Sequence, residues 1–208
     1  MLRVMRDVLN DRFSRTDVVV RTPAVLVPFG REGSESTEII PAKYIEKDKA
    51  GNLVYGIANG SGTWMRSSLD AHNGYVASID KRLGGKVKPL VRFLKAWKYY
   101  QNVPILSFYL ELRVAKYASG EGAIVYSTNL RNILKELWDN QLAAMQDPMG
   151  VSGYIYPCAT DAKKQEALSK LNTALGRAQK ARDAEMAKKD SDAFYWWDLL
   201  FADKFLAY

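Results

Sequence analysis

Cysteine and histidine are almost missing from this sequence. Among its 208 residues there are one cysteine, Cys158, and one histidine, His72. A single cysteine excludes an internal disulfide framework, and a single histidine excludes a histidine cluster for zinc. No nucleophile-elbow motif supports Ser-His-Asp catalysis. We therefore interpret both lone residues as structural.

Long apolar runs are missing as well. No stretch approaches the roughly 18 consecutive apolar residues of a membrane-spanning helix, so we expect no membrane span. Arg3, Arg6 and Asp7 interrupt the start of the chain, so we expect no secretory leader. Together with the lone cysteine, these features predict a cytoplasmic protein.

What the sequence does have is positive charge. It contains 30 Lys and Arg against 23 Asp and Glu, a net charge of +7, which suits anionic partners such as nucleotides or nucleic acid. The hydrophobic fraction of 48% is typical of a globular protein. The charge is concentrated from Lys81 to Lys98, where seven basic residues and no acidic one occur.

This basic run has the pattern of an amphipathic helix over 86–101. Lys88, Arg92 and Lys95 follow the spacing i, i+4 and i+7 and share one face. The other face is apolar and must be buried; it contains Val87, Leu90, Val91, Leu94 and Trp97. A cationic face beside a helix start favours phosphate, because free backbone N–H groups and the helix dipole both attract anions. An ordinary solvated basic face is the alternative interpretation.

The rest of the chain predicts an α+β fold. Strands are expected over 17–27, 37–40 and 53–57, with 30–36 as a hairpin turn between the first two. Helices are expected over 2–13, 68–82, 86–101, 104–118, 127–145, 162–188 and 191–205. We place a boundary between residues 67 and 68, which gives a sheet-containing part, 1–67, and a helical part, 68–208.

Helix limits follow from local signals. Pro104 suits the first turn of the helix 104–118, since its missing N–H costs little there. Asp147-Pro148 is expected to end the helix 127–145, and Thr160 or Asp161 to cap the helix 162–188. The charged, alanine-rich run 177–192 is typical of a solvated helix.

Several segments, in order along the chain, resemble one enzyme family. The family is that of the cyclic GMP-AMP-synthase-like nucleotidyltransferases, the bacterial cyclic-oligonucleotide synthases related to oligoadenylate synthetases. The resemblance implies a small antiparallel or mixed sheet, part of a polymerase-β-like core, followed by a mainly helical carboxy-terminal lobe. The segments are TEIIPAKYI (37–45), MRSSLDAHNGYVASIDKRLGG (65–85), KVKPLVRFLKAWKYYQNVPILSFYLEL (86–112), DPMGVSGYI (147–155) and WWDLLFADKFLAY (196–208).

The resemblance assigns roles to four residues. Glu38 matches the third catalytic carboxylate, which helps to activate the acceptor hydroxyl and binds Mg²⁺, although the family usually has Asp there. Lys95 and Ser107 match the residues that contact the triphosphate of the donor nucleotide, and Phe108 matches the aromatic ring that stacks on the base. The alternatives are an edge-strand glutamate that keeps a sheet soluble and a phenylalanine packed in the core.

The family's remaining motif, Gly-Ser followed by Asp-x-Asp on a strand, is not found. Gly60-Ser61 imitates its first half and Asp190-Ser191-Asp192 its second, but we interpret neither as catalytic. We expect the chain to be a carboxy-terminal portion that lacks the catalytic dyad and is inactive alone, because one carboxylate cannot neutralise two divalent cations.

The function implied for the complete protein is synthesis of cyclic di- or oligonucleotide second messengers. It would use nucleoside triphosphates and two Mg²⁺ ions, with a regulatory protein partner and no requirement for nucleic acid, in bacterial anti-phage defence. Two alternatives stay open. One is a non-catalytic, basic helical module that binds nucleotides or RNA, and the other is a different polymerase-β-like nucleotidyltransferase.

Overall fold

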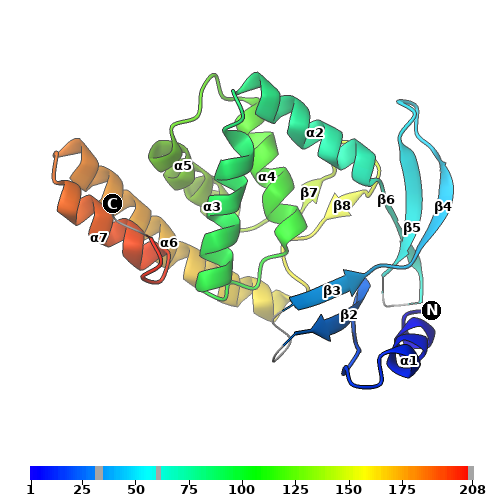
Figure 1. Cartoon of the computed structure of the whole chain (residues 1–208). Coiled ribbons are helices and arrows are strands. Elements are labelled where there is room, and N and C mark those ends of the chain that lie inside the picture. The colour runs from blue at the N-terminus through cyan, green and yellow to red at the C-terminus, as the bar shows by residue number, and fades with distance from the viewer. Residues whose placement is uncertain (31–34, 60–61, 206–208) are drawn as a thin grey trace. The chain divides into compact units, whose positions relative to one another are not determined.

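The chain forms two compact units, Met1–Ala71 and His72–Tyr208. The computed structural model in Figure 1 describes residues 1–30, 35–59 and 62–205. The fold is α+β, with small antiparallel sheets followed by a mainly helical part, as predicted. The predicted domain limits 1–67 and 68–208 stay a prediction. None of the helices in the described ranges is long and apolar enough to cross a membrane.

The first unit contains one helix and two three-stranded antiparallel sheets. Its core is small and is built where α1 packs on the first sheet, around Leu2, Val18, Val25 and Val27. The elements are α1 (Leu2–Arg12), β1 (Val19–Arg21), β2 (Ala24–Phe29), β3 (Glu35–Ile39), β4 (Ala42–Lys47), β5 (Leu53–Ala58) and β6 (Trp64–Ser67).

The strand predicted over 17–27 was wrong as one continuous strand. The chain reverses at Thr22 and Pro23, and Val20 pairs with Val25 across the resulting hairpin. Proline has no N–H to donate to a sheet ladder, which explains why pairing stops there. Strands β2 and β3 are antiparallel, as predicted, although residues 31–34 of their connection lie outside the described residues. The sequence reasoning missed β4 and β6.

The second unit is helical. A buried core runs through it, and its largest fully buried side chains include Trp97, Tyr109, Leu134 and Leu171. Its elements are α2 (Leu69–Arg82, whose first residues belong to the first unit), α3 (Val87–Tyr100), α4 (Ser107–Ser119), α5 (Tyr126–Asp139), the short strands β7 (Met145–Gln146) and β8 (Tyr154–Ile155), α6 (Asp161–Met186) and α7 (Asp190–Leu200).

Three predicted helix limits in this unit were wrong, and one of them is the end of α7, which lies at Leu200 and not at residue 205. Pro104 lies in the extended link before α4, which begins only at Ser107. Helix α5 ends at Asp139, and Asp147-Pro148 instead follows β7 in a turn. The predicted cap of α6 is confirmed, since the side chain of Thr160 accepts a hydrogen bond from the backbone N–H of Lys163 at 3.2 Å.

The sequence predicted a solvated helix over 177–192, but the end of α6 is partly buried. Ala178, Ala181 and Ala184 are buried, and α6 packs between α5 and α7. Small side chains let helices approach closely, so the alanines form the contact stripe while Lys180 and Asp183 between them stay exposed.

Candidate functional site

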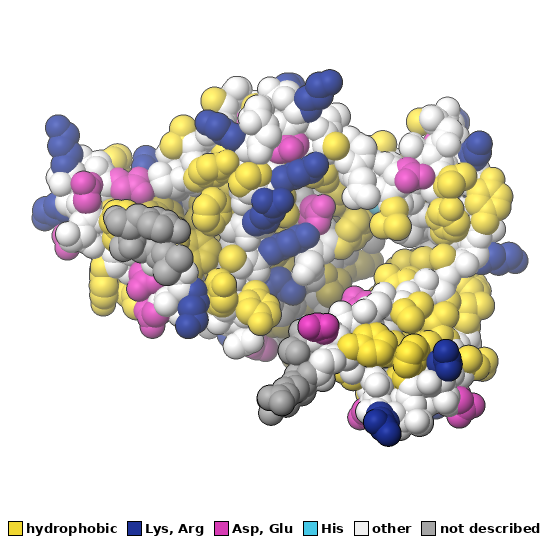
Figure 2. Space-filling model, viewed as in Figure 1, with side chains coloured by type: hydrophobic (Ala, Val, Ile, Leu, Met, Phe, Trp, Pro, Cys, Tyr) yellow, Lys and Arg dark blue, Asp and Glu magenta, His cyan; other side chains and the backbone are white. Residues whose placement is uncertain are grey.

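The packing of α3 fixes the direction of its charges. All five residues predicted to be buried are buried: Val87, Leu90, Val91, Leu94 and Trp97. The basic residues therefore lie on the outer side, and Figure 2 shows Lys and Arg side chains gathered over the region of α3 and α4. Arg92 forms no hydrogen bond or ion pair with any described residue. This face is the most concentrated positive feature of the helical unit.

The starts of α3 and α4 differ in a way that matters for anions. One carboxylate oxygen of Asp80 accepts the backbone N–H groups of both Val87 and Lys88 at 2.9 Å, so the first turn of α3 is already satisfied. No side chain caps α4, which begins after Leu106 in extended conformation. Because uncapped N–H groups and the helix dipole attract negative charge, the start of α4 suits an anion better than the start of α3 does.

The first turn of α4 is held firmly in place. The N–H of Leu106 donates to the carbonyl of Pro157 at 2.7 Å. One turn further, the buried hydroxyl of Tyr109 donates to the carbonyl of Ala143 at 2.7 Å and accepts from Arg113 at 3.0 Å. Burial raises the pKa of Tyr109, so its hydroxyl stays a donor. The start of α4 is thus preorganised by contacts on both sides.

Two lysines of α3 reach across to this helix. Lys95 forms an ion pair with Glu111, which the sequence reasoning left without a role. The ammonium of Lys98 donates to the hydroxyl of Ser107 at 3.2 Å. The sequence-predicted residues Lys95 and Ser107 therefore lie on the same α3–α4 contact. Lys98 was missed as a site residue, although its position three residues after Lys95 places it on the same helical face.

Phe108 is only partly packed. Its side chain is 42% exposed, and its ring meets the ring of His72 edge to face, with 5.0 Å between centroids. An exposed ring held at one edge offers its face to a planar partner such as a base. We call Lys95, Lys98, Ser107, Phe108 and Glu111 the α3–α4 site.

Behind Phe108 lies a buried polar network that the sequence reasoning missed. A ring nitrogen of His72 lies 2.9 Å from a carboxylate oxygen of Asp147, and that carboxylate also accepts backbone N–H groups from Met149, Val151 and Ser152. Burial of Asp147 favours its neutral form. The hydrogen bonds from the turn and from His72 stabilise the carboxylate more, so the pKa of Asp147 lies below its ordinary value.

The chain is similar to known proteins in its sequence and in its fold. No family model matches the chain. A probable cyclic nucleotide synthase from Bacillus cereus is 23% identical over 175 residues, which are 81% of this chain and 51% of that protein. The structure of E. coli MS115-1 CdnC with ATP matches 99% of this chain and 72% of its own, with a TM-score of 0.69 and 17% identity.

A second solved structure is Vibrio cholerae DncV cyclic AMP-GMP synthase with the linear intermediate pppA(3′,5′)pG. It matches 96% of this chain and 58% of its own, with a TM-score of 0.73 and 14% identity. The chain has the CdnC and DncV fold. The resemblance to cyclic GMP-AMP-synthase-like nucleotidyltransferases is confirmed. The chain spans about half the length of the curated relative that it matches.

Glu38 belongs to the first unit of this CdnC and DncV fold. It lies exposed on β3, an edge strand, opposite Leu26 of β2. In the described ranges no group of three His, Cys, Asp or Glu could hold a metal ion. The residues present therefore do not fit a pair of Mg²⁺ ions by themselves.

Of the two imitations of the missing motif, the described residues contain only Asp190-Ser191-Asp192. Gly60-Ser61 lies outside the described residues. Asp190 and Asp192 form the first turn of α7, where helical geometry replaces the strand on which an Asp-x-Asp dyad is carried. A place in the first turn of a helix is consistent with the interpretation of Asp190 and Asp192 as non-catalytic.

The buried Asp147 yields a prediction about acid stability. Replacing it in Asp147→Asn leaves the turn and His72 without their charged acceptor, which costs about 1–3 kcal/mol. We expect the melting temperature at pH 7 to fall by several degrees. Because the pKa of Asp147 is depressed, its contribution is complete above its ordinary value and is lost as pH falls below about 4.

Thermal melts from pH 7 to pH 3 should therefore show the gap between the two proteins narrowing at the acid end. Asp139→Asn is the matched control, since Asp139 is an exposed partner of Lys135 and its loss should change the melting temperature little. A gap that stays constant down to pH 3 would contradict the role given to the carboxylate.

Proposed function

We propose that the chain is the carboxy-terminal part of a nucleotidyltransferase that makes cyclic di- or oligonucleotides from nucleoside triphosphates. The observation that carries this is the α3–α4 site, where an uncapped helix start, two lysines and a half-exposed aromatic ring lie together. These are the groups that a nucleoside triphosphate requires, namely hydrogen-bond donors and positive charges for the phosphates and an aromatic surface for the base. Similarity to CdnC with ATP and to DncV with its linear intermediate supports the proposal.

Within this site, Lys95 and Lys98 bind the triphosphate and Ser107 donates to it from the first turn of α4. Lysine suits this task as a compact charge on a flexible stem. Glu111 holds Lys95 in position while no anion is bound, and the ammonium exchanges this partner for phosphate on binding. Phe108 stacks on the base, with its edge positioned by His72.

Glu38 is the carboxylate that we assign to activation of the acceptor hydroxyl. Its position on an edge strand of the first unit leaves the side chain accessible. Within residues 1–30, 35–59 and 62–205, no further His, Cys, Asp or Glu residues complete a metal site around it.

The first unit has an apolar surface that suits a larger protein. Met1, Val4 and Val8 are all more than 60% exposed and follow helical spacing along one side of α1. We propose that further polypeptide of the synthase covers this stripe. E. coli MS115-1 CdnC has been solved in complex with HORMA-deltaN, and we propose by analogy a regulatory protein partner, a cytoplasmic setting and a role in anti-phage defence.

A second candidate function is favoured by one observation. Tyr99 is 76% exposed and lies next to Tyr100, directly after the basic run of α3. Exposed tyrosines beside lysines suit stacking on single-stranded RNA, so the helical unit could act as a non-catalytic RNA-binding module. Affinity for RNA that falls steeply with salt and exceeds affinity for ATP would favour this function.

The charge balance of the α3–α4 site predicts opposite effects of two substitutions on ATP binding by the 208-residue chain. Lys95→Ala should weaken binding by about tenfold, because a hydrogen bond to a charged group contributes about 1.5–3 kcal/mol. Glu111→Gln should strengthen it by about two- to threefold, since a nearby negative charge is removed. Calorimetric titration measures both effects, with the exposed Lys135→Ala as control. Equal ATP affinities in all three variants would argue against the site.

Stacking on Phe108 can be separated from phosphate binding. Phe108→Ala should weaken ATP binding by about fivefold or more, because stacking contributes about 1–3 kcal/mol per base. Inorganic tripolyphosphate has no base, so its affinity should not change. Tyr154→Ala, which removes another exposed ring, is the control. If both ligands lose affinity equally, Phe108 acts on the fold of the site and not on the base.

Catalysis requires a protein that also carries the Gly-Ser and Asp-x-Asp motifs. In such a protein, incubated with labelled nucleotides and Mg²⁺, we expect cyclic products, and we expect Glu38→Gln to reduce their formation by at least about a hundredfold while ATP binding is retained. Chromatography of the products measures this. Absence of cyclic and linear products from every nucleotide mixture would contradict the proposed function.

A further inference from the structure

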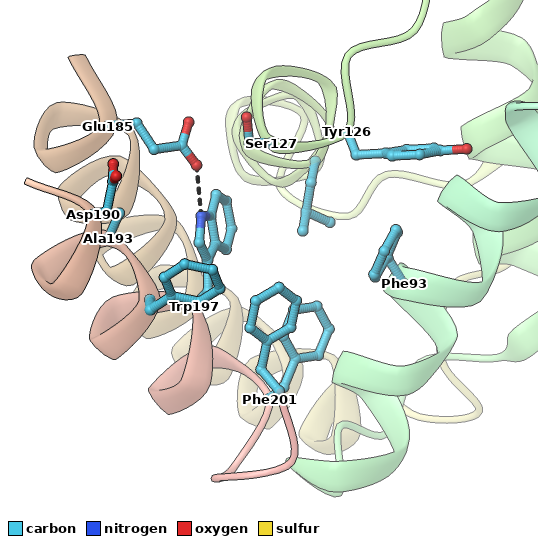
Figure 3. A pocket seen from close by; sticks show the side chains of 11 residues that line it. Phe93, Tyr126, Ser127, Glu185, Asp190, Ala193, Trp197 and Phe201 are labelled. Atoms are coloured by element: carbon cyan, nitrogen blue, oxygen red, sulfur yellow. Dashed lines mark hydrogen bonds between the residues drawn. The ribbon is translucent and has the colours of Figure 1, made fainter. Parts of the chain in front are cut away.

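A cavity of about 310 Å³ lies in the helical unit among α3, α5 and α7 and the end of α6 (Figure 3). Its size is that of a pocket for a small organic molecule. Its lining is almost entirely apolar and includes Phe93, Leu130, Ala193, Trp197 and Phe201. None of the residues of the α3–α4 site lines it, so it is a separate feature of the molecule.

The walls of this cavity are held by contacts between rings. Phe93 packs against Tyr126 and against Phe201, with 5.5 and 6.0 Å between centroids. Phe201 in turn stacks on Phe205 at 5.5 Å with nearly parallel planes. Rings that brace one another in this way keep the cavity open and give it flat surfaces. A planar, apolar group of a ligand would meet ring faces on more than one side.

The charged groups that line the cavity are two carboxylates, those of Glu185 and Asp190, and only one of them has a cationic partner among the described residues. Glu185 accepts the indole N–H of Trp197 at 2.8 Å, as Figure 3 shows, and forms an ion pair with Arg182. The same arginine donates to the hydroxyl of Ser127 at 3.1 Å. Asp190, at the start of α7, has no ion pair with any described residue.

We propose that this cavity binds a small molecule that combines a flat apolar ring with a protonated amine. The ring enters between the aromatic side chains, where burial of apolar surface stabilises it. The amine points to the carboxylate of Asp190, which has no cationic partner among the described residues. In the described ranges no Lys or Arg lines the cavity, and the nearby Arg182 is already paired with Glu185, so a nucleotide phosphate would meet carboxylates in the lining.

Three probes that share one ring test this proposal: 1-naphthylmethylamine, 1-naphthalenemethanol and 1-naphthoate. At pH 7 they carry a positive, a neutral and a negative group on the same naphthalene. Calorimetric titration of the 208-residue chain should give the highest affinity for the amine, up to about fivefold above the alcohol, since an exposed ion pair contributes about 0.2–1 kcal/mol. The carboxylate should bind most weakly.

Three variants assign the binding to the cavity. Asp190→Asn should abolish the preference for the amine over the alcohol without weakening the alcohol. Asp192→Asn removes a charge from the same helical turn but does not line the cavity, so it should keep the preference. Ala193→Leu should fill part of the space and weaken the amine and the alcohol alike, and its melting curve reports whether it folds.

The proposal is overturned by any of three results. One is the absence of binding by all three probes at millimolar concentration. A second is an equal affinity for amine and carboxylate. The third is an amine preference that survives Asp190→Asn, which would place the probe elsewhere. Because the Asp190 comparison uses a substitution on an exposed residue, it decides the question even if Ala193→Leu does not fold.

Discussion

Burial of one side of α3 is the constraint on which the candidate site depends. Leu90, Leu94 and Trp97 are almost completely removed from water, and burying side chains of this size contributes about 1.5–3 kcal/mol each. The helix cannot rotate about its axis without exposing them. Its rotation is therefore set by the core, and Lys95 and Lys98 must lie toward α4. Charge placement at the surface is in this sense a consequence of hydrophobic packing.

Helices α3 and α4 gather positive charge, and nearby carboxylates neutralise part of it. Asp80 occupies the start of α3, and Glu111 neutralises Lys95 from α4. The start of α4 has no such acceptor. An anion that arrives there competes with the partly exposed carboxylate of Glu111, so the desolvation that it must overcome is modest. This balance distinguishes an anion site from a uniformly basic surface, which would attract any polyanion.

The sequence predicted what depends on local spacing and missed what depends on distant contacts. Helical periodicity was sufficient for α3 and its buried side, because apolar spacing encodes it directly. Pro104 predicted a start for α4 that was too early. The segment before α4 is extended, and the N–H of Leu106 donates to the carbonyl of Pro157, a residue far along the chain. Ala178 looked like filler because burial by α7 is a tertiary effect. The pairing of His72 with Asp147 joins residues 75 positions apart, and no periodic pattern contains it.

The position of the chain's one imidazole has a practical consequence. Because the sequence has a single histidine and that ring lies against the edge of Phe108, its carbon-bound protons give isolated proton resonances in a magnetic resonance spectrum. Aromatic rings shift the resonances of nearby nuclei, so any molecule that stacks on Phe108 or turns it changes the chemical shift of this one residue. The fold thus contains its own spectroscopic reporter beside the candidate site, without a label or a substitution.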